Sequence, residues 1–279
     1  MTRNQSDAQV AIEAGSLAGE LLLQLRQAAV TGEATSSAFD ADALRAAGDR
    51  DANRAIMKLL ANERPEDSLL SEEAADDPRR LIAERVWIID PLDGTREFGE
   101  QDSAGVWRDD FAVHVALWER GNGLTLGVVG LPARGVIYSS DARTVVPPSP
   151  AGPLRIAVSR TRPPGFIAAL ESAGSAKLLP MGSAGVKVMA VVSGEADAYI
   201  HAGGQYQWDS AAPVAVALAA GLVATRLDGS PLRYNVPELL LPDLVVCHPD
   251  RADEVRLLLD AAGFGLDGAS GAGAAESAG

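Results

Sequence analysis

Residues 86–98, VWIIDPLDGTREF, decide how this chain folds. The apolar run VWII predicts a buried strand that leads directly into Asp90 and Asp93. Gly94 then lets the backbone turn and approach a ligand closely, and Thr95 is expected to be the N-cap of the next helix. The sequence therefore predicts two carboxylates at the carboxyl end of a buried strand, beside the N-terminus of a helix.

A turn of this kind suits phosphate chemistry. The N-terminus of a helix offers unpaired N–H groups and a partial positive charge to a phosphate. Two neighbouring carboxylates repel each other, and repel a phosphate, unless divalent cations lie between them. Oxygen ligands favour Mg²⁺ over zinc or copper. Two such ions can activate a water and stabilise the leaving oxygen of a phosphate ester.

Further acidic residues are placed where the same site could use them. They are Glu72 and Glu73 in SEEA, and Asp209 in WDSA. Taken singly, the glutamates are typical of a solvated helix start, Asp209 of an N-cap, and DPLDGT of a β-turn. Their joint occurrence in one chain favours a metal site.

The rest of the chain predicts two layered domains and a tail. Residues 1–150 are expected to form an α+β domain, in which helices at 7–29 and about 40–62 pack on an antiparallel sheet. The run VVPPSPAGP at 145–153 predicts the boundary to a smaller α/β domain at 151–265. Residues 266–279, mostly Gly, Ala and Ser, predict a disordered tail. The expected strands are 86–89, 111–117, 125–129, 135–139, 154–158, 176–179, 198–200 and 244–247, and the later helices are 164–173, 183–193, 210–220 and 251–262.

Composition excludes several classes of protein. The 279 residues carry a net charge of −14, which argues against binding to a nucleic-acid backbone. The single cysteine, Cys247, permits no internal disulfide and no multi-cysteine metal site, so a reducing cytoplasm is the expected compartment. Charged residues interrupt the N-terminal apolar pattern, so we expect neither a signal peptide nor a membrane span. The expected partner is a small anionic molecule.

Two segments, WIIDPLDGT at 87–95 and WDSA at 208–211, resemble the signature of the inositol monophosphatase-like family of Mg²⁺-dependent, lithium-sensitive phosphatases. The resemblance covers about residues 7–262. It implies a layered αβαβα sandwich, with N-terminal helices and an antiparallel sheet followed by a smaller α/β domain. Relatives of this fold occur as monomers and as dimers, so the sequence leaves a homodimer open.

Within that family, SEEA, DPLDGTREF, AVSRTR at 157–162, GSAGVK at 182–187 and GEADAYI at 194–200 are most similar to the CysQ-type 3′(2′),5′-bisphosphate nucleotidases. The similarity implies hydrolysis of the 3′-phosphate of 3′-phosphoadenosine 5′-phosphate, and of the related phosphosulfate, in sulfate assimilation. One alternative is a broader phosphatase acting on inositol 1-phosphate or fructose 1,6-bisphosphate. Against the inositol reading, Ala202 stands where inositol-preferring relatives carry an acidic residue. A second alternative is an inactive metal-binding or nucleotide-binding regulator.

The resemblance also implies roles for single residues. Glu72, Asp90 and the backbone oxygen of Leu92 would hold the first Mg²⁺, and Asp90, Asp93 and Asp209 the second, with Li⁺ as an inhibitor. A metal-activated water would then attack phosphorus in line.

Three residues are implied in catalysis, namely Glu72, Asp49 and Thr95. Asp49 and Thr95 would orient the attacking water, and Asp49 may be replaced in this role by Asp51 or Asp42, because the segment before it lacks the pattern common in relatives. A third ion is expected near Asp49.

Substrate contacts are expected from both halves of the chain. In the first half, Asp93 and the N–H groups of Gly94 and Thr95 would meet the phosphate, together with Asp209 from the second. The remaining candidates are Ser159, Arg160, Gly182, Ser183 and Lys187. For the two cations among them, a solvated surface position is an equal alternative. His114 alternates with apolar residues and is expected to be a hydrogen-bonded strand residue, not a general base.

Overall fold

Strand β2 (Arg85–Asp93) is apolar on both of its faces. In the computed structural model, which describes residues 5–31, 40–172 and 174–264, successive side chains of β2 enter two different cores. Trp87 and Ile89 belong to one core, and Val86 and Ile88 belong to the other. Because successive side chains of a strand point to opposite faces, both faces of this sheet must be covered. The predicted tail at 266–279 lies outside the described residues.

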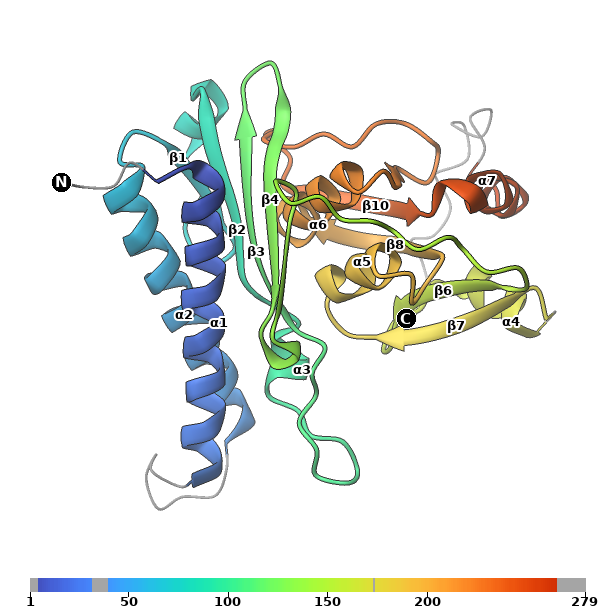
Figure 1. Ribbon diagram of the computed structural model, residues 1–279, viewed down its shortest axis with the longest axis horizontal. Helices are drawn as coiled ribbons and strands as arrows, with labels where there is room; N and C mark the ends of the chain where they lie inside the picture. Colours follow the sequence, from blue (N-terminus) through green and yellow to red (C-terminus); the bar gives the residue numbers. More distant parts are fainter. Residues whose placement is uncertain (1–4, 32–39, 173, 265–279) are drawn as a thin grey trace, which may run out of the picture.

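The first sheet has the order β1-β2-β3-β4-β5, and helices α1 (Asp7–Thr31) and α2 (Ala41–Glu63) cover its outer face (Figure 1). Its other strands are β1 (Ser68–Ser71), β3 (Ala112–Glu119), β4 (Gly123–Leu131) and β5 (Val136–Ser139). The expectation of a purely antiparallel sheet is wrong at one edge, because β1 pairs with β2 in parallel. Strand β1 has only four residues, SLLS, and gives no periodic signal of its own.

The second sheet has the order β7-β6-β8-β10-β9. Helices α5 (Ala184–Val192) and α6 (Gln207–Ala219) lie between the two sheets, and α4 (Gly165–Ser172) and α7 (Ala252–Ala261) lie on the far side (Figure 1). The layers are therefore αβαβα, as expected. Its strands are β6 (Leu154–Ser159), β7 (Ala176–Met181), β8 (Ala198–Tyr206), β9 (Val223–Thr225) and β10 (Leu240–Cys247).

Short helical segments complete the chain. Three are 3₁₀ turns that begin at proline, η1 (Pro78–Ile82), η2 (Pro132–Arg134) and η3 (Pro249–Arg251). The fourth is α3 (Thr95–Phe98), which follows DPLDG. The expectation that Thr95 caps this helix is wrong: the N-cap is Gly94, with φ of 89°, and Thr95 is the first helical residue. Glycine takes this left-handed conformation without steric cost, which frees the Thr95 hydroxyl for other partners.

Across residues 5–31, 40–172 and 174–264, no helix is both long enough and apolar enough to cross a membrane.

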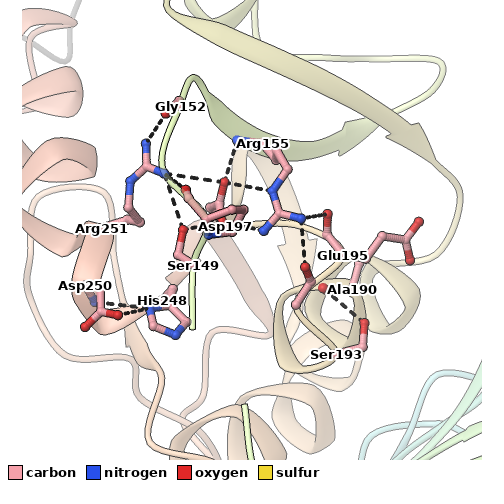
Figure 2. A network of polar contacts seen from close by, with 12 residues as sticks. Ser149, Gly152, Arg155, Ala190, Ser193, Glu195, Asp197, His248, Asp250 and Arg251 are labelled. Carbon is pink, nitrogen blue, oxygen red and sulfur yellow. Dashed lines mark hydrogen bonds and ion pairs between the residues drawn. The ribbon is translucent and has the colours of Figure 1, made fainter. Parts of the chain in front are cut away.

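A buried carboxylate ties the segment between the two sheets to the second sheet. Figure 2 shows Asp197, which is fully buried, between Arg155 and Arg251. It accepts hydrogen bonds from Arg155 Nη2 at 2.7 Å, from the Arg155 backbone N–H at 2.8 Å and from Ser149 Oγ at 2.6 Å. Ser149 lies in the predicted boundary segment, so this network fastens that segment in place. The division into domains at residue 150 stays a prediction.

Removing the charge of Asp197 should destabilise the protein. Burial acts to raise the pKa of Asp197, but the bonds from Arg155 and Ser149 outweigh it and hold the pKa below the ordinary value. Asp197→Asn leaves Arg155 without its ion-pair partner, so we expect a loss of about 3 kcal/mol in the free energy of unfolding at neutral pH. Urea denaturation measures it.

The lowered pKa of Asp197 also determines how the loss in the free energy of unfolding depends on pH. A carboxyl whose pKa is lowered by folding stabilises the protein above its usual titration range, and this contribution is lost as the pH falls through the lowered pKa. The difference between wild type and Asp197→Asn should therefore shrink in acid. Asp253→Asn, on the exposed face of α7, is the control. Equal midpoints for all three proteins at neutral pH would contradict the prediction.

Candidate active site

Three carboxylates meet where β2 ends and α6 begins. Asp90, Asp93 and Asp209 each place an oxygen within 4.8 Å of the others. In a regular strand, residues three apart point to opposite faces. The pairing of β2 with β3 shifts register between Asp90 and Asp93, and this irregularity lets both side chains reach one cluster. Asp209 arrives from the first turn of α6.

Each of the three is held by a backbone N–H group. Leu92 N donates to Asp90 Oδ1 at 3.0 Å, and Tyr206 N donates to Asp209 Oδ2 at 2.6 Å. Gly185 N, in the first turn of α5, donates to Asp93 Oδ2 at 2.7 Å. The cluster is therefore fixed by three separate elements, β2, α5 and α6, before any ligand binds.

A fourth carboxylate comes from the turn after β1. Glu72 N donates to Ile89 O at 3.2 Å, which extends the pairing of β1 with β2 and places the Glu72 carboxyl near Asp90 and Asp93. Glu73, which the sequence also offered for this site, follows Glu72 in the same turn, and its charge acts to raise the pKa of Glu72. The short parallel strand that the sequence did not reveal is thus what brings Glu72 to the cluster.

Burial and mutual repulsion raise the pKa values of these carboxyls. Burial, followed by the charge of Asp93, raises the pKa of Asp209 to about 7. Burial raises the pKa of Glu72 to about 7, against the lowering effect of its bond to Asp90. Burial and the charges of Asp93, Glu72 and Asp209 raise the pKa of Asp90 well above the ordinary value. Burial and repulsion therefore oppose full ionisation of the cluster, and a bound cation would relieve both.

The donor set fits hard divalent cations. Asp90 Oδ2 is buried and has no hydrogen-bond partner among the described residues. An unpaired buried carboxylate oxygen is costly unless a proton or a cation meets it. The four carboxylates that converge here offer oxygen, which suits Mg²⁺ better than softer metals. Glu72, Asp90, Asp93 and Asp209 are the residues that would hold such ions.

Asp49 lies beside Thr95, where the resemblance placed it. Thr95 Oγ1 is 3.1 Å from Asp49 Oδ1 and 3.0 Å from Leu92 O. Burial and the charge of Glu73 raise the pKa of Asp49 to about 6, and its bond to Thr95 opposes this.

The two alternatives to Asp49 have other partners. Asp51 pairs with Arg50 at 2.8 Å, and Asp42, which is almost fully exposed, pairs with Arg45 at 2.8 Å. Neither contacts Thr95 in the structure. The geometry therefore favours Asp49 for the role that the resemblance left open.

The hydroxyl of Ser183 forms hydrogen bonds within the protein. Its hydroxyl donates to Asp93 Oδ2, and its oxygen accepts from Val186 N at 3.0 Å as the cap of α5. Its backbone has φ of 50°, a conformation that few residues other than glycine adopt. We infer that Ser183 positions Asp93 in addition to lining the cavity.

His114 is fully buried and behaves as expected of a strand residue. Its Nδ1 lies 3.3 Å from Trp208 O, and its Nε2 lies 3.3 Å from Asp93 Oδ2. Burial lowers the pKa of His114, although Asp93 acts to raise it. Trp208 itself is buried and stacks on Tyr206, with ring centroids 4.8 Å apart, so packing accounts for it.

Arg160 does not line the cavity of the candidate site. It bridges to Glu97 at 3.1 Å and to Asp110, and the same Asp110 oxygen accepts a hydrogen bond from Gly182 N at 2.7 Å. Burial acts to raise the pKa of Asp110, but the bonds from Gly182 and Arg160 outweigh it and lower the pKa. The guanidinium is thus neutralised by two carboxylates from the first half of the chain. In the structure Arg160 therefore joins the two layers, and its expected contact with substrate stays a prediction.

Gly182 is required at this contact. A Cβ atom at residue 182 would lie 2.3 Å from Glu97 Cδ, far inside van der Waals contact. In the structure Gly182 allows close packing of the two layers and donates its N–H to Asp110, and it also lines the cavity, so its expected contact with substrate stays a prediction.

A cavity of about 290 Å³ opens beside the carboxylates. Lys187 lines it and is buried, so the alternative of a solvated surface cation is wrong for this residue. Ser159 lines it from the end of β6. Several lining residues were not singled out by the sequence, among them Arg162, Tyr199, His201, Gly204 and Gln205. Arg162 stood in the quoted AVSRTR segment, but nothing in the sequence separated it from Arg160. The remaining lining residues are Asp93, Gly94, Thr95, Arg96, Glu97, Thr161, Gly182, Ser183, Ala184 and Asp209.

A larger cavity of about 570 Å³ lies elsewhere, between the β3–β4 turn and the far part of α6. Its lining contains Trp118, Leu218 and Arg233 but no carboxylate. The smaller cavity is the one with the chemistry of a metal site.

Known proteins share this sequence and this architecture. The chain is 51% identical over 252 residues to the 3′-phosphoadenosine 5′-phosphate phosphatase of Mycobacterium tuberculosis (strain CDC 1551 / Oshkosh), covering 88% of each chain. It is 32% identical to the 3′(2′),5′-bisphosphate nucleotidase CysQ of Escherichia coli (strain K12), over 70% of this chain and 81% of that one. The crystal structure of CysQ from Bacteroides thetaiotaomicron, a bacterial member of the inositol monophosphatase family, superposes with a TM-score of 0.70 at 30% identity, over 87% of this chain and 97% of that one.

The sequence model of the inositol monophosphatase family matches residues 3–258, a span that includes both sheets and every carboxylate of the cluster. With the layered fold and the acidic site already described, this match leads to one conclusion: the chain belongs to the inositol monophosphatase family.

Proposed function

We propose that this protein is a Mg²⁺-dependent phosphatase that removes the 3′-phosphate of 3′-phosphoadenosine 5′-phosphate. The observation that carries the proposal is the cluster of buried Asp90 and Asp93 with half-buried Asp209. One oxygen of Asp90 is unpaired among the described residues, and the adjoining cavity also contains buried Lys187. A site that is acidic at one side and basic at the other suits a phosphorylated substrate bound through cations. The named relative with 51% identity supports the choice of substrate.

The chain's own residues supply orientation and proton transfer. Thr95 Oγ1 has one proton and lies between Asp49 Oδ1 and Leu92 O, so donation to Asp49 leaves its lone pairs available to a water. With a pKa of about 6, Asp49 is charged at neutral pH and can accept the hydrogen bond from the Thr95 hydroxyl. The pair Asp49 and Thr95 therefore orients the attacking water.

The carboxylates prepare the place for the phosphate. Glu72, Asp90, Asp93 and Asp209, with Leu92 O, are the proposed ligands of two Mg²⁺ ions, and Asp90 is the shared one. The chemistry that Mg²⁺ supplies when bound is to offset the phosphate charge and to make an attacking water more acidic. Gly94 and Thr95 line the cavity and are proposed to offer their N–H groups to the phosphate oxygens.

Several finer points belong to this proposal. They are a third Mg²⁺ near Asp49, inhibition by Li⁺ in place of one ion, hydrolysis of the related phosphosulfate and a role in sulfate assimilation. A cytoplasmic location and a homodimer remain predictions from the sequence and the resemblance.

Replacing one shared ligand should abolish turnover without unfolding the protein. We expect Asp90→Asn to lower kcat by about a hundredfold or more, because it weakens both metal positions. It removes one of several mutually repelling carboxylates, so the melting temperature in EDTA should not fall. Phosphate release from 3′-phosphoadenosine 5′-phosphate, inositol 1-phosphate and fructose 1,6-bisphosphate, with Mg²⁺, with EDTA and with added Li⁺, measures activity and preference.

Asp253→Asn on the exposed face of α7 is the matched control and should keep full activity. Near-normal activity of Asp90→Asn would reject the metal site. Equal rates on all three substrates would retain the metal site and reject the proposed substrate.

The stabilising effect of Mg²⁺ should depend on pH. The pKa values of Glu72 and Asp209 are raised to about 7 on folding, so their contribution to stability is present below their ordinary pKa range and is lost as the pH rises through about 7. Mg²⁺ binds the charged carboxylates and reverses that loss. Saturating Mg²⁺ should raise the melting temperature by about 5 °C or more near pH 8 and by much less near pH 6.

Differential scanning fluorimetry at matched ionic strength measures this difference. Asp90→Asn should show a smaller Mg²⁺ effect at both pH values. The same rise at both pH values in wild type would contradict the assigned ligands.

A further inference from the structure

Three cations line the cavity beside the carboxylates, and none has an ion-pair partner among the described residues: Arg96, Arg162 and Lys187. Arg96 belongs to α3, next to Gly94 and Thr95, whereas Arg162 and Lys187 come from the second half of the chain. Arg160, two residues before Arg162, has its charge neutralised by Glu97 and Asp110. The sequence offered two arginines in AVSRTR, and the structure separates them: one joins the layers, and the other faces the cavity.

Lys187 has hydrogen-bonding capacity to spare. Its side chain is buried, its Nζ donates to Gly182 O at 3.2 Å, and it lies 5.3 Å from the centre of the Tyr199 ring. An ammonium group has three donors, so two remain for a ligand. Burial of this cation is offset in part by the nearby charges of Asp93, Glu97, Asp110 and Asp209, none of which forms an ion pair with it.

Carboxylates and cations line the same cavity. Asp93 and Asp209 act on the charge of Lys187, and both Lys187 and Arg162 act on His201, which also lines the cavity. His201 Nε2 is 3.2 Å from Gly204 O. A ligand that fits this lining carries one anionic group for the cations held by the carboxylates and a second anionic group for Lys187 and Arg162.

We propose that Arg162 and Lys187 bind the phosphate that is not hydrolysed, so that the basic end of the cavity selects substrates with two phosphate groups. This inference rests on the proposed function and adds a determinant of specificity to it. The guanidinium of Arg162 is exposed and unpaired in the described part of the chain, so it can form a bidentate contact with a phosphate. Lys187 supplies a second, buried donor from one turn into α5.

Kinetics with paired substrates tests the proposal. Adenosine 3′-monophosphate has the reacting phosphate of 3′-phosphoadenosine 5′-phosphate but lacks the second one. Arg162→Ala should lower kcat/KM for the bisphosphate by about tenfold to a hundredfold, mainly through KM, because charged hydrogen bonds of this kind have that effect. It should leave kcat/KM for the monophosphate within about twofold. Equal losses on both substrates, or no loss on either, would overturn the proposal.

Calorimetry separates this proposal from the proposed function. Adenosine 5′-monophosphate retains the second phosphate, and adenosine has none, so their binding requires no turnover. Arg162→Ala should weaken binding of adenosine 5′-monophosphate by about tenfold and leave adenosine unchanged. If wild type released no phosphate from any substrate, the proposed function would fail and this binding result would still decide the inference.

Two more variants complete the design. Lys177→Ala removes an exposed cation from β7 of the second sheet. It should change neither the kcat/KM values nor the binding of adenosine 5′-monophosphate. Lys187→Met keeps the length of a buried side chain without its charge, and it should impair the bisphosphate more than the monophosphate. A loss for Lys177→Ala as large as that for Arg162→Ala would mean that overall charge, and not contact, governs affinity, and would overturn the proposal.

Discussion

Repulsion among buried carboxylates is the constraint on which the rest of this structure depends. Asp90, Asp93 and Asp209 are brought within 4.8 Å by three different elements, although their charges favour separation. The register shift in β2 and the N–H groups of Leu92, Gly185 and Tyr206 all act to hold them there. Folding supplies the energy for this arrangement, through cores on both faces of the first sheet.

The contact between the two layers also helps to hold the carboxylate cluster in place. Arg160 and Gly182 come from the second half of the chain, and Glu97 and Asp110 come from the first. Because Gly182 has no side chain, the loop before α5 packs directly on Glu97 and delivers Ser183 and Gly185 to Asp93. The ion pair and the close packing thus set the distance between the two sides of the cavity.

Much of this could be predicted from the sequence, because strong local patterns coincide with the features concerned. The apolar run before Asp90, the helix periodicity of α1 and the signature segments each stand in a continuous stretch, and the predicted elements lie within a few residues of those observed. The carboxylates were predicted for the same reason. Strands β1 and β9 were not predicted, because four and three residues are too few to show a period.

The sequence reveals least about residues whose partners are distant in the chain. No local pattern reveals that Arg160 meets Glu97 and Asp110 while Arg162 faces the cavity, since the two arginines alternate along the same segment. Thr95 looked like a cap because threonine often is one, yet the left-handed Gly94 takes that position. Such assignments depend on which layer a side chain meets, and only the packed fold determines that.

The ligands of the cluster lie in opposite halves of the chain, and this affects how the molecule matures. Asp90 and Asp93 belong to β2, whereas Asp209 opens a helix between the two sheets that follows most of the second half. Contacts between distant parts of a chain form late, because closing long loops costs entropy before any contact repays it. During synthesis, a ribosome-bound chain that ends before α6 has strands and helices but an incomplete cation site. The full set of carboxylates therefore comes together only after α6 has packed against the first sheet, late in the synthesis of the chain.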